Sequence, residues 1–289
     1  DPAVVDPLVA EADAVLNVAA ETHVDRSILD PEAFLRTGVI GVHVLLEAIR
    51  AEAAKDRSVR FLQVSTDEVY GDITDGHSVE TDPLAPRSPY AAAKASSELL
   101  VRAYHITYGL DVVLTRGSNT YGPYQHPEKL IPLFTTNALA GEPLPMYGDG
   151  MQVRDWIHVS DHAAGIEYVL RHGASGEAYN VAGAKLLPNR EVIGLLLEAA
   201  DRDWSLVRTV PDRPGHDRRY AMDGSKLAAL GWAPTVSFED GLPATVAWYR
   251  DHPEWVASAR SGDWHGYYER QYGARLAAGR AVEQQGREG

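Results

Sequence analysis

The sequence predicts an α/β fold in which a mostly parallel sheet is covered by helices. Short apolar runs alternate with longer segments whose apolar residues recur at helical spacing, and this order is typical of parallel strands joined by helices. The chain has 289 residues, of which 45% are apolar, so its core can support one large domain or two.

The first half of the chain contains the elements of the predicted sheet. Phe34 and Ile40 belong to an apolar pattern with helical spacing. Pro89 and Gly109 delimit a second helix, because proline is favoured in a first helical turn and glycine just after a last one. Strands are predicted over 15–19, 59–65 and 112–115, and helices over 33–54 and 91–108.

Beyond Asn119 the composition changes, because proline and glycine become frequent. We expect a loop-rich, helical second part that leans on the sheet, followed by a polar and frayed tail over 276–289. Helices are predicted over 131–140, 161–171, 190–200 and 238–250.

Composition and charge exclude several classes of function. Lys and Arg number 27 against 41 Asp and Glu, so the formal net charge is −14, which argues against general nucleic-acid binding but not against one small anionic ligand. The absence of Cys excludes disulfides, Cys metal sites and thiol catalysis, and fits a cytoplasmic location. No apolar run approaches the roughly 18 residues of a membrane span, no signal segment opens the chain, and we expect no metal site.

The strongest chemical motif is Tyr90-x-x-x-Lys94. On a helix these residues lie one turn apart on the same face, and a nearby ammonium lowers the pKa of a phenol. Such a tyrosine can take a hydroxyl proton while a nicotinamide accepts hydride. By itself, however, this motif is explained as readily by chance as by a catalytic role.

A polar segment follows the predicted strand over 59–65. Thr66 offers a hydroxyl, and Asp67 and Glu68 offer two carboxyls, at the strand end where ligands bind in open α/β sheets. One acid can remove a proton while the other protonates a leaving oxygen, which is the equipment of an elimination. The alternative is a strand-end turn with solvated acids.

Six sequence blocks resemble, in order, the dTDP-glucose 4,6-dehydratases, a group within the extended short-chain dehydrogenase/reductase family. The resemblance extends from near residue 1 to about Tyr272. The blocks are AAETHVDRSI (Ala19–Ile28), VSTDEVYGD (Val64–Asp72), ETDPLAPRSPYAAAKASSELL (Glu80–Leu100), SNTYGPYQHPEKLIP (Ser118–Pro132), YGDGMQVRDWIHVSDH (Tyr147–His162) and DRPGHDRRYAMD (Asp212–Asp223).

The resemblance implies a reaction in which NAD oxidises C4 of the glucosyl unit, water is eliminated across C5 and C6, and hydride returns to C6. The product is dTDP-4-dehydro-6-deoxy-glucose, an intermediate of deoxysugar synthesis. By resemblance, Tyr90 is the base on the 4-hydroxyl and Lys94 lowers its pKa and holds the nicotinamide ribose. Thr66 binds near O4, Asp67 is the acid for the 6-hydroxyl, and Glu68 takes the C5 proton.

The resemblance also implies two sets of binding residues. The guanidinium groups of Arg154 and Arg213 suit phosphate oxygens; the less favoured alternative for them, and for Lys129, is a surface or salt-bridge role. His216 could be an ordinary loop histidine and His23 a structural one. The expected cofactor residues are Ala19, Ala20, Ser65, Tyr90, Lys94 and Asn119, and the expected substrate residues are His23, Asn119, Lys129, Leu130, Arg154, Asn189, Arg213 and His216.

The sequence departs from the family pattern in several places. Thr120 stands where a second Asn is expected, Gly117 where Cys is common, and Ala91 and Ala92 where a small polar residue often follows the tyrosine. No Gly-rich dinucleotide-binding turn occurs, so we expect that the chain is a fragment lacking a portion the size of a βαβ unit.

Taken together, the expected architecture is a Rossmann-type parallel sheet, truncated at its N-terminal end, with a smaller mixed α/β substrate domain. The expected division is an NAD-binding part over 1–182 and a substrate part over 183–289, with 120–156 also serving the substrate site. A homodimer is expected through the helices 33–54 and 91–108. The alternatives are another nucleotide-sugar dehydratase or epimerase of the family, acting on a UDP-sugar, and a non-catalytic nucleotide-sugar-binding fragment.

Overall fold

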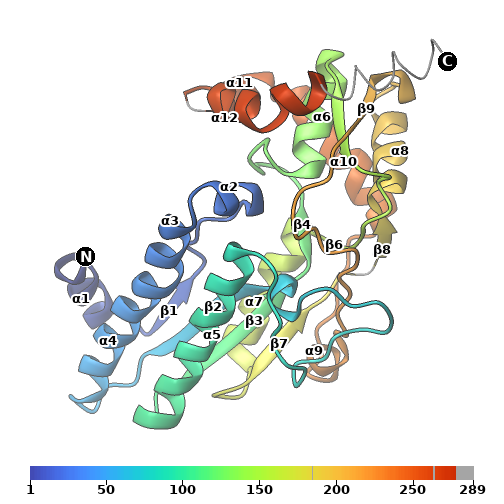
Figure 1. Ribbon diagram of the computed structural model, residues 1–289. Helices are drawn as coiled ribbons and strands as arrows, with labels where there is room; N and C mark the ends of the chain where they lie inside the picture. Colours follow the sequence, from blue (N-terminus) through green and yellow to red (C-terminus); the bar gives the residue numbers. More distant parts are fainter. Residues whose placement is uncertain (184, 263, 278–289) are drawn as a thin grey trace. The chain divides into compact units, whose positions relative to one another are not determined.

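The computed structural model describes residues 1–183, 185–262 and 264–277 (Figure 1). The described chain divides into two compact units. Unit 1 comprises Asp1–Asn119, Asp161–Gly183 and Tyr220–Pro234, and unit 2 comprises Thr120–Ser160 and the described parts of Ala184–Arg219 and Thr235–Gly289. The functional division at residue 182 stays a prediction.

Unit 1 is built on a four-stranded sheet in which every neighbouring pair is parallel, in the order β1-β2-β3-β7. Leu16 lies opposite Leu62, and Thr115 lies opposite Tyr179. The expected Rossmann-type sheet is therefore confirmed. Its strands are β1 (Ala14–Asn17), β2 (Arg60–Thr66), β3 (Val112–Gly117) and β7 (Ala178–Val181).

Helices cover this sheet because their apolar faces meet its β-branched and aromatic side chains. Figure 1 shows α1, α4 and α5 side by side, and Leu46, Phe61 and Val101 share one core cluster beneath them. Helix α7 packs on β7, where a Cβ added to Gly165 would meet the Val181 side chain at 2.6 Å. The helices are α1 (Pro2–Glu11), α2 (Val24–Leu29), α3 (Pro31–Leu35), η1 (Arg36–Ile40), α4 (Gly41–Ala53), η2 (Asp67–Tyr70), α5 (Pro89–Tyr108), α7 (Val159–His172) and α9 (Ser225–Ala229).

The predicted elements of unit 1 are confirmed with shifted ends. The helix expected over 33–54 runs from Pro31 to Ala53, and its middle, η1, is π-helical. Helix α1 was not expected, because Pro7 lies inside it and Val9 is its only buried residue, so the sequence carries little helical pattern.

Unit 2 combines short strands with three longer helices. A sheet of order β4-β6-β8 contains an antiparallel pair, β6 with β8, and a second sheet pairs β5 with β9 in parallel. The strands are β4 (Asn119–Tyr121), β5 (Leu144–Tyr147), β6 (Val153–His158), β8 (Lys185–Pro188) and β9 (Val207–Val210). The helices are α6 (Leu130–Ala140), α8 (Asn189–Ala199), η3 (Trp204–Leu206), α10 (Phe238–Asp251), α11 (Pro253–Ala259), α12 (Trp264–Tyr268) and η4 (Glu269–Gly273).

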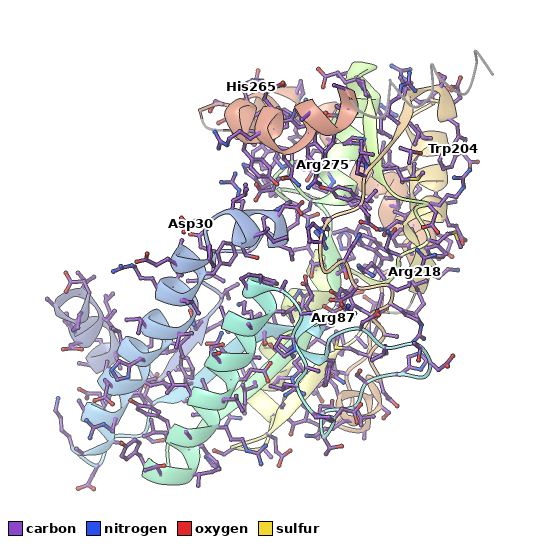
Figure 2. All side chains as sticks on the ribbon, viewed as in Figure 1. Asp30, Arg87, Trp204, Arg218, His265 and Arg275 are labelled. Carbon is purple, nitrogen blue, oxygen red and sulfur yellow. The ribbon has the colours of Figure 1, made fainter. Side chains whose placement is uncertain are left out.

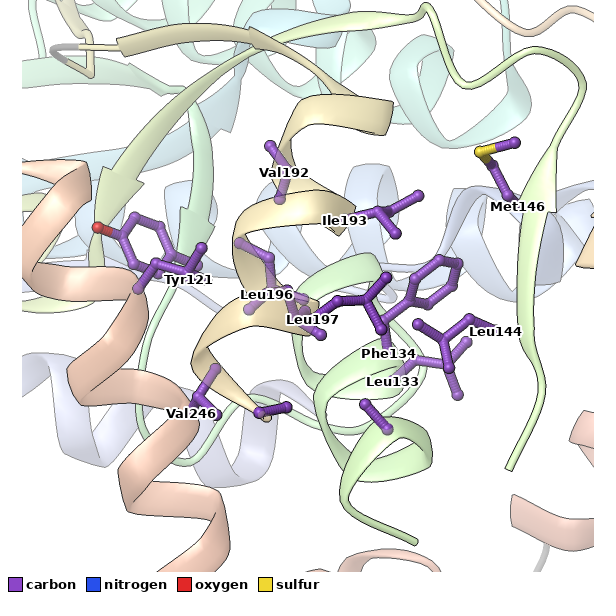
Figure 3. Close-up of a cluster of buried hydrophobic side chains, with 14 of the residues drawn as sticks. Tyr121, Leu133, Phe134, Leu144, Met146, Val192, Ile193, Leu196, Leu197 and Val246 are labelled. Atoms are coloured by element: carbon purple, nitrogen blue, oxygen red, sulfur yellow. The ribbon is translucent and has the colours of Figure 1, made fainter. Parts of the chain in front are cut away.

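The core of unit 2 lies among α6, α8 and α10. Figure 3 shows Leu133, Leu196 and Val246 pointing toward one another from these three helices, and each of them is at most 1% exposed. The four helices predicted in the second half are confirmed, and so is the mixed α/β character of this part, although no individual strand was located from the sequence there. Most of the expected frayed tail, residues 278–289, lies outside the described residues. Within the described residues, no helix combines the length and apolar character needed to cross a membrane.

Candidate functional site

The carboxyl end of β2 turns directly into η2 and presents three polar side chains. Thr66 caps this turn, since its Oγ1 accepts a hydrogen bond from the Glu68 backbone N–H at 3.3 Å. The same hydroxyl donates to Asp67 Oδ1 at 3.1 Å. Asp67 is buried and Glu68 is half-buried. Thr66 therefore orients one acid and the backbone of the other.

Helix α5 brings the Tyr-x-x-x-Lys motif to this turn. Ser88 caps the helix by accepting a hydrogen bond from Ala91 N–H at 3.1 Å, so Tyr90 lies in the first turn and Lys94 one turn later. The Tyr90 hydroxyl is hydrogen-bonded to Thr66. The ring of Phe34, in α3, meets the Tyr90 ring edge-on with centroids 6.2 Å apart. The predicted catalytic side chains thus meet in unit 1.

The electrostatics of this group differ from those expected from the motif alone. Burial raises the pKa of Tyr90 well above its usual value, the charge of Glu68 raises it further, and the hydrogen bond between Tyr90 and Thr66 opposes both. Lys94 donates to the Val64 carbonyl at 3.1 Å, and burial lowers its pKa to about 8, against the attraction of Glu98. Tyr90 is therefore a neutral phenol at neutral pH in this structure.

The expected cofactor residues lie along the carboxyl edge of the parallel sheet. Ala19 and Ala20 follow β1 and carry only methyl side chains. The Ser65 hydroxyl and Asn119 Oδ1 are buried without a hydrogen-bond partner among the described residues. Unsatisfied buried polar atoms cost free energy, so these positions suit a polar ligand.

In unit 2 a second cluster forms around Arg154 in β6. Arg154 is 4% exposed and donates to the Val153 and Asp217 carbonyls, each at 2.8 Å. Nδ1 of His216 lies 2.5 Å from Asp212 Oδ1, whose other carboxylate oxygen accepts from Gln152 at 2.9 Å. The chain thus gathers residues from two separate segments at one place.

Burial and positive charge determine the state of His216. Burial lowers the pKa of its imidazole to about 4, the charges of Arg213 and Arg154 lower it further, and Asp212 opposes them. His216 is therefore uncharged at neutral pH, and it lies among two guanidinium groups. Arginine forks of this kind suit phosphate oxygens.

The remaining predicted substrate residues lie at helix starts. Lys129 immediately precedes α6 and Leu130 opens it, and both are half-buried. Asn189 opens α8, and its Oδ1 is buried without a hydrogen-bond partner among the described residues. His23 precedes α2 and is buried 3.9 Å from the Asp25 carboxylate. The substrate role of each of these residues stays a prediction.

Two other arginines of unit 2 bind polar side chains of the same unit. Arg218, labelled in Figure 2, holds Asp149 through two hydrogen bonds of 2.8 and 2.9 Å. Arg275, also labelled there, donates to the Tyr147 hydroxyl at 2.7 Å.

The part of the chain that the structure describes holds no group of three or more His, Asp or Glu side chains that could bind a metal ion.

The structure explains one departure from the family pattern. A Cβ added to Gly117 would lie 2.3 Å from Nε2 of His162, so the His162 ring occupies the space that a larger residue at 117 would need. Burial lowers the pKa of His162 to about 4. The contact of His162 with Gly117 was not predicted from the sequence, and neither was the buried pair of Arg116 and Glu98. The sequence feature that could have revealed this pair is Arg116 itself, a charged residue near the end of a mostly apolar strand.

A parallel sheet with a Tyr-x-x-x-Lys helix beside the carboxyl end of a central strand defines an enzyme of the extended short-chain dehydrogenase/reductase class. The model of the GDP-mannose 4,6 dehydratase family matches residues 1–245. A dTDP-glucose 4,6-dehydratase of Streptomyces niveus is 51% identical over 91% of this chain and 77% of its own length. The dTDP-glucose 4,6-dehydratase 1 of Escherichia coli is 46% identical over 92% and 80%.

A solved structure is equally similar. DesIV, a dTDP-glucose 4,6-dehydratase from Streptomyces venezuelae crystallised with NAD and TYD bound, has a TM-score of 0.87 at 51% identity, over 90% of this chain and 80% of that one. A UDP-glucose 4-epimerase from Thermus thermophilus with NAD has a TM-score of 0.81 at 33% identity, over 86% of this chain and 82% of that one. The chain belongs to the dTDP-glucose 4,6-dehydratase family.

Proposed function

We propose that this protein converts dTDP-glucose to dTDP-4-dehydro-6-deoxy-glucose with NAD as cofactor, through the residues described above. The observation that carries the proposal is the contact between the Tyr90 hydroxyl and Thr66, beside Asp67 and Glu68. For oxidation at C4, a tyrosine base is sufficient on the protein's side, because NAD would accept the hydride. Two additional carboxyls beside the tyrosine supply what an elimination needs, a base for carbon and an acid for oxygen.

The residues at the sheet edge fit NAD. The unpartnered Ser65 hydroxyl and Asn119 Oδ1 can hold polar groups of the cofactor, and the small side chains of Ala19 and Ala20 leave room for it to approach. Among the described residues Lys94 makes one hydrogen bond, so its ammonium can also hold a ribose hydroxyl. When bound, NAD supplies the acceptor for the hydride at C4 and its donor at C6.

In the first half of the reaction, Tyr90 accepts the proton of the 4-hydroxyl in its phenolate form, so its own proton must leave first. Because burial and Glu68 raise the pKa of Tyr90, the Tyr90 phenol can lose its own proton at neutral pH only when positive charge lies close to it. Lys94, one turn further along α5, is the cation on the same helix face. Thr66, already hydrogen-bonded to Tyr90, orients O4 for the transfer.

In the second half, oxidation at C4 has made the C5 proton acidic. Glu68 removes that proton, and Asp67 protonates the 6-hydroxyl, which leaves as water. The two acids are held differently: Asp67 is 3% exposed and hydrogen-bonded to Thr66, whereas Glu68 is half-buried. We assign the proton donor to Asp67, the more buried of the two acids, and the base to Glu68.

Unit 2 contributes the binding of the nucleotide diphosphate. Arg154 and Arg213 surround the neutral His216 and present two guanidinium groups in a chain of net charge −14. Two such forks bind diphosphate oxygens with defined geometry. We assign the additional substrate contacts to Asn119, Lys129, Leu130, Asn189 and His23.

The test follows the mass of the nucleotide sugar. The protein is incubated with NAD and either dTDP-glucose or UDP-glucose. We expect a product lighter by one water, formed preferentially from dTDP-glucose. A product of unchanged mass would identify an epimerase, and preferential conversion of UDP-glucose would assign a UDP-sugar as the substrate. Binding without conversion would contradict the enzyme proposal.

The proposal includes a homodimer in the cytoplasm, the compartment of nucleotide-sugar metabolism. Exposed apolar side chains support an interface on α5 and the neighbouring helix: Ile40 is 57% exposed, Leu99 60% and Ile106 71%. Leu99→Arg with Ile106→Arg should convert the dimer to a monomer in sedimentation experiments. Unchanged dimers would contradict this interface.

A further inference from the structure

Four buried polar side chains outside the proposed catalytic set form one network in unit 1. They are Tyr70, Glu98, Arg116 and Asn180, and none of them is more than 6% exposed. Each lies on a different element: Tyr70 ends η2, Glu98 lies in α5, Arg116 in β3 and Asn180 in β7. The network therefore joins four elements around the end of the sheet.

Arg116 is the centre of this network. Its Nη2 and Nε donate to Glu98 Oε2 at 2.7 and 3.0 Å. Its Nη1 donates to the Tyr70 hydroxyl at 2.7 Å and to the Glu80 carbonyl at 3.1 Å, and its guanidinium lies 4.7 Å from the centroid of the Tyr70 ring. One side chain thus holds both the carboxylate of α5 and the phenol of η2.

Asn180 fixes the other side of the Tyr70 hydroxyl. The hydroxyl donates to Asn180 Oδ1 at 2.7 Å. Nδ2 of Asn180 donates in turn to the carbonyls of Ser78 and Asp223, at 3.0 and 3.1 Å. The Tyr70 hydroxyl therefore uses both its donor and an acceptor site, and its position is tied to the backbone of β7.

The two ends of the network are close in sequence to the reacting groups. Tyr70 lies in the same short turn as Asp67 and Glu68. Glu98 follows Lys94 by four residues, so both lie on one face of α5. Any displacement of Tyr70 relative to Glu98 therefore moves the acid pair relative to the helix that carries the tyrosine and lysine.

We propose that Arg116, through Tyr70 and Glu98, is a positioning residue: it fixes the turn Thr66–Glu68, called the acid turn below, relative to helix α5. The elimination step depends on this positioning more than the oxidation step does. This inference rests on the proposed function. Stability alone explains the network poorly, because a buried ion pair is seldom more stabilising than apolar side chains of the same volume. A misplacement of about 1 Å, however, can slow a reaction roughly a hundredfold.

The test separates the two half-reactions. Oxidation at C4 already has Tyr90 and Thr66 in contact, whereas proton removal from C5 needs Glu68 at the correct distance. The substitution Tyr70→Phe removes the hydroxyl that Arg116 and Asn180 share. We expect water loss and C5 hydrogen exchange with solvent to slow about tenfold or more, and cofactor reduction in a single turnover to change less than about twofold.

Two further variants complete the experiment. Glu98→Gln keeps the shape of the side chain but weakens the hold on Arg116, so it should slow C5 exchange in the same selective way. Tyr179→Phe is the matched control, because Tyr179 is 3% exposed and its hydroxyl accepts only from Ala174 N–H, at 2.9 Å, among the described residues. It should leave both half-reactions unchanged even if it lowers the melting temperature.

The outcomes distinguish this inference from the function on which it rests. If the wild-type protein does not dehydrate dTDP-glucose, the proposed function is wrong. If the wild type is active but Tyr70→Phe and Glu98→Gln slow oxidation and elimination equally, or change only the melting temperature, the positioning role of Arg116 is wrong. Selective loss of C5 exchange in both variants would support it.

Discussion

The acid turn of unit 1 and the arginine cluster of unit 2 are assembled in opposite ways. Thr66, Asp67 and Glu68 are consecutive, and they meet a helix whose two functional side chains are one turn apart. The cluster around Arg154, in contrast, takes His216 from a segment more than fifty residues away along the chain. The first arrangement is local in sequence, and the second depends on the tertiary fold.

The two regions also differ in charge and therefore in the step that they control. Burial raises the pKa of Tyr90 and the charge of Glu68 in the acid turn raises it further, whereas burial lowers the pKa of His216 to about 4 with the help of the two arginines. Groups that exchange protons with the substrate act in the transition state, so their loss lowers kcat. Groups that hold the diphosphate act in both ground and transition states, so their loss raises KM.

Among the variants considered, Tyr90→Phe should have the largest effect, and that effect should be on kcat. The variant keeps the ring that packs against Phe34 but cannot accept the 4-hydroxyl proton. We expect kcat for dehydration to fall roughly a thousandfold, with the affinity for dTDP unchanged. Mass spectrometry and titration calorimetry measure the two quantities, and a variant that keeps more than about a tenth of the wild-type rate would remove Tyr90 from its assigned role.

Glu68→Gln should distinguish the role of Glu68 from that of Asp67. Without a carboxylate at this position, exchange of the C5 hydrogen with solvent should fall roughly a hundredfold while cofactor reduction persists. Asp67→Asn is the paired variant: it should preserve C5 exchange and slow only the loss of water. The reverse pattern would exchange the roles of the two residues.

Arg213→Ala tests the other region. Because the arginine holds the diphosphate and not the reacting carbons, KM for dTDP-glucose should rise about tenfold while kcat changes less than about threefold. Arg208→Ala is the control, because that guanidinium donates to the Ser205 and Val207 carbonyls of the same unit. An Arg213→Ala variant whose defect lies wholly in kcat would contradict the division between binding and chemistry.

The same contrast explains how much could be predicted from the sequence. The parallel sheet, the helix of Tyr90 and the acid turn follow from apolar periodicity and from short motifs, which depend on neighbours in sequence. Resemblance, and not spacing, pointed to Arg154 and His216, because nothing local relates two segments that only the fold brings together. The family itself, inferred from six blocks of sequence, is confirmed by the relatives and their structures.

What the sequence did not predict has a physical reason in each case. The strands of unit 2 are short, and two of them contain a proline, Pro145 in β5 and Pro188 in β8, which is a poor strand former. The upward shift of the Tyr90 pKa arises from burial, which a motif does not report. Arg116 and His162 act through contacts across β3, β7 and α7, so only the packed structure reveals them.

The smallest expected effect concerns stability and comes from His162. Burial lowers the pKa of its imidazole from 6.5 to about 4, so the folded state keeps the ring neutral where the unfolded state binds a proton. Its contribution to the free energy of unfolding is therefore complete above pH 6.5 and is lost as the pH falls toward 4. Between pH 7 and pH 5 the loss should be about 2 kcal/mol.

Urea denaturation of the wild type and of His162→Gln at several pH values measures this loss. The glutamine side chain cannot take up a proton, so the variant should lose less stability than the wild type on acidification, although removal of the ring that packs against Gly117 lowers its stability at pH 7. His172→Gln, at an exposed position in the last turn of the same helix, should follow the wild type. Parallel curves for wild type and His162→Gln would show that the ring carries its proton in the folded state, and that burial at Gly117 does not keep it neutral.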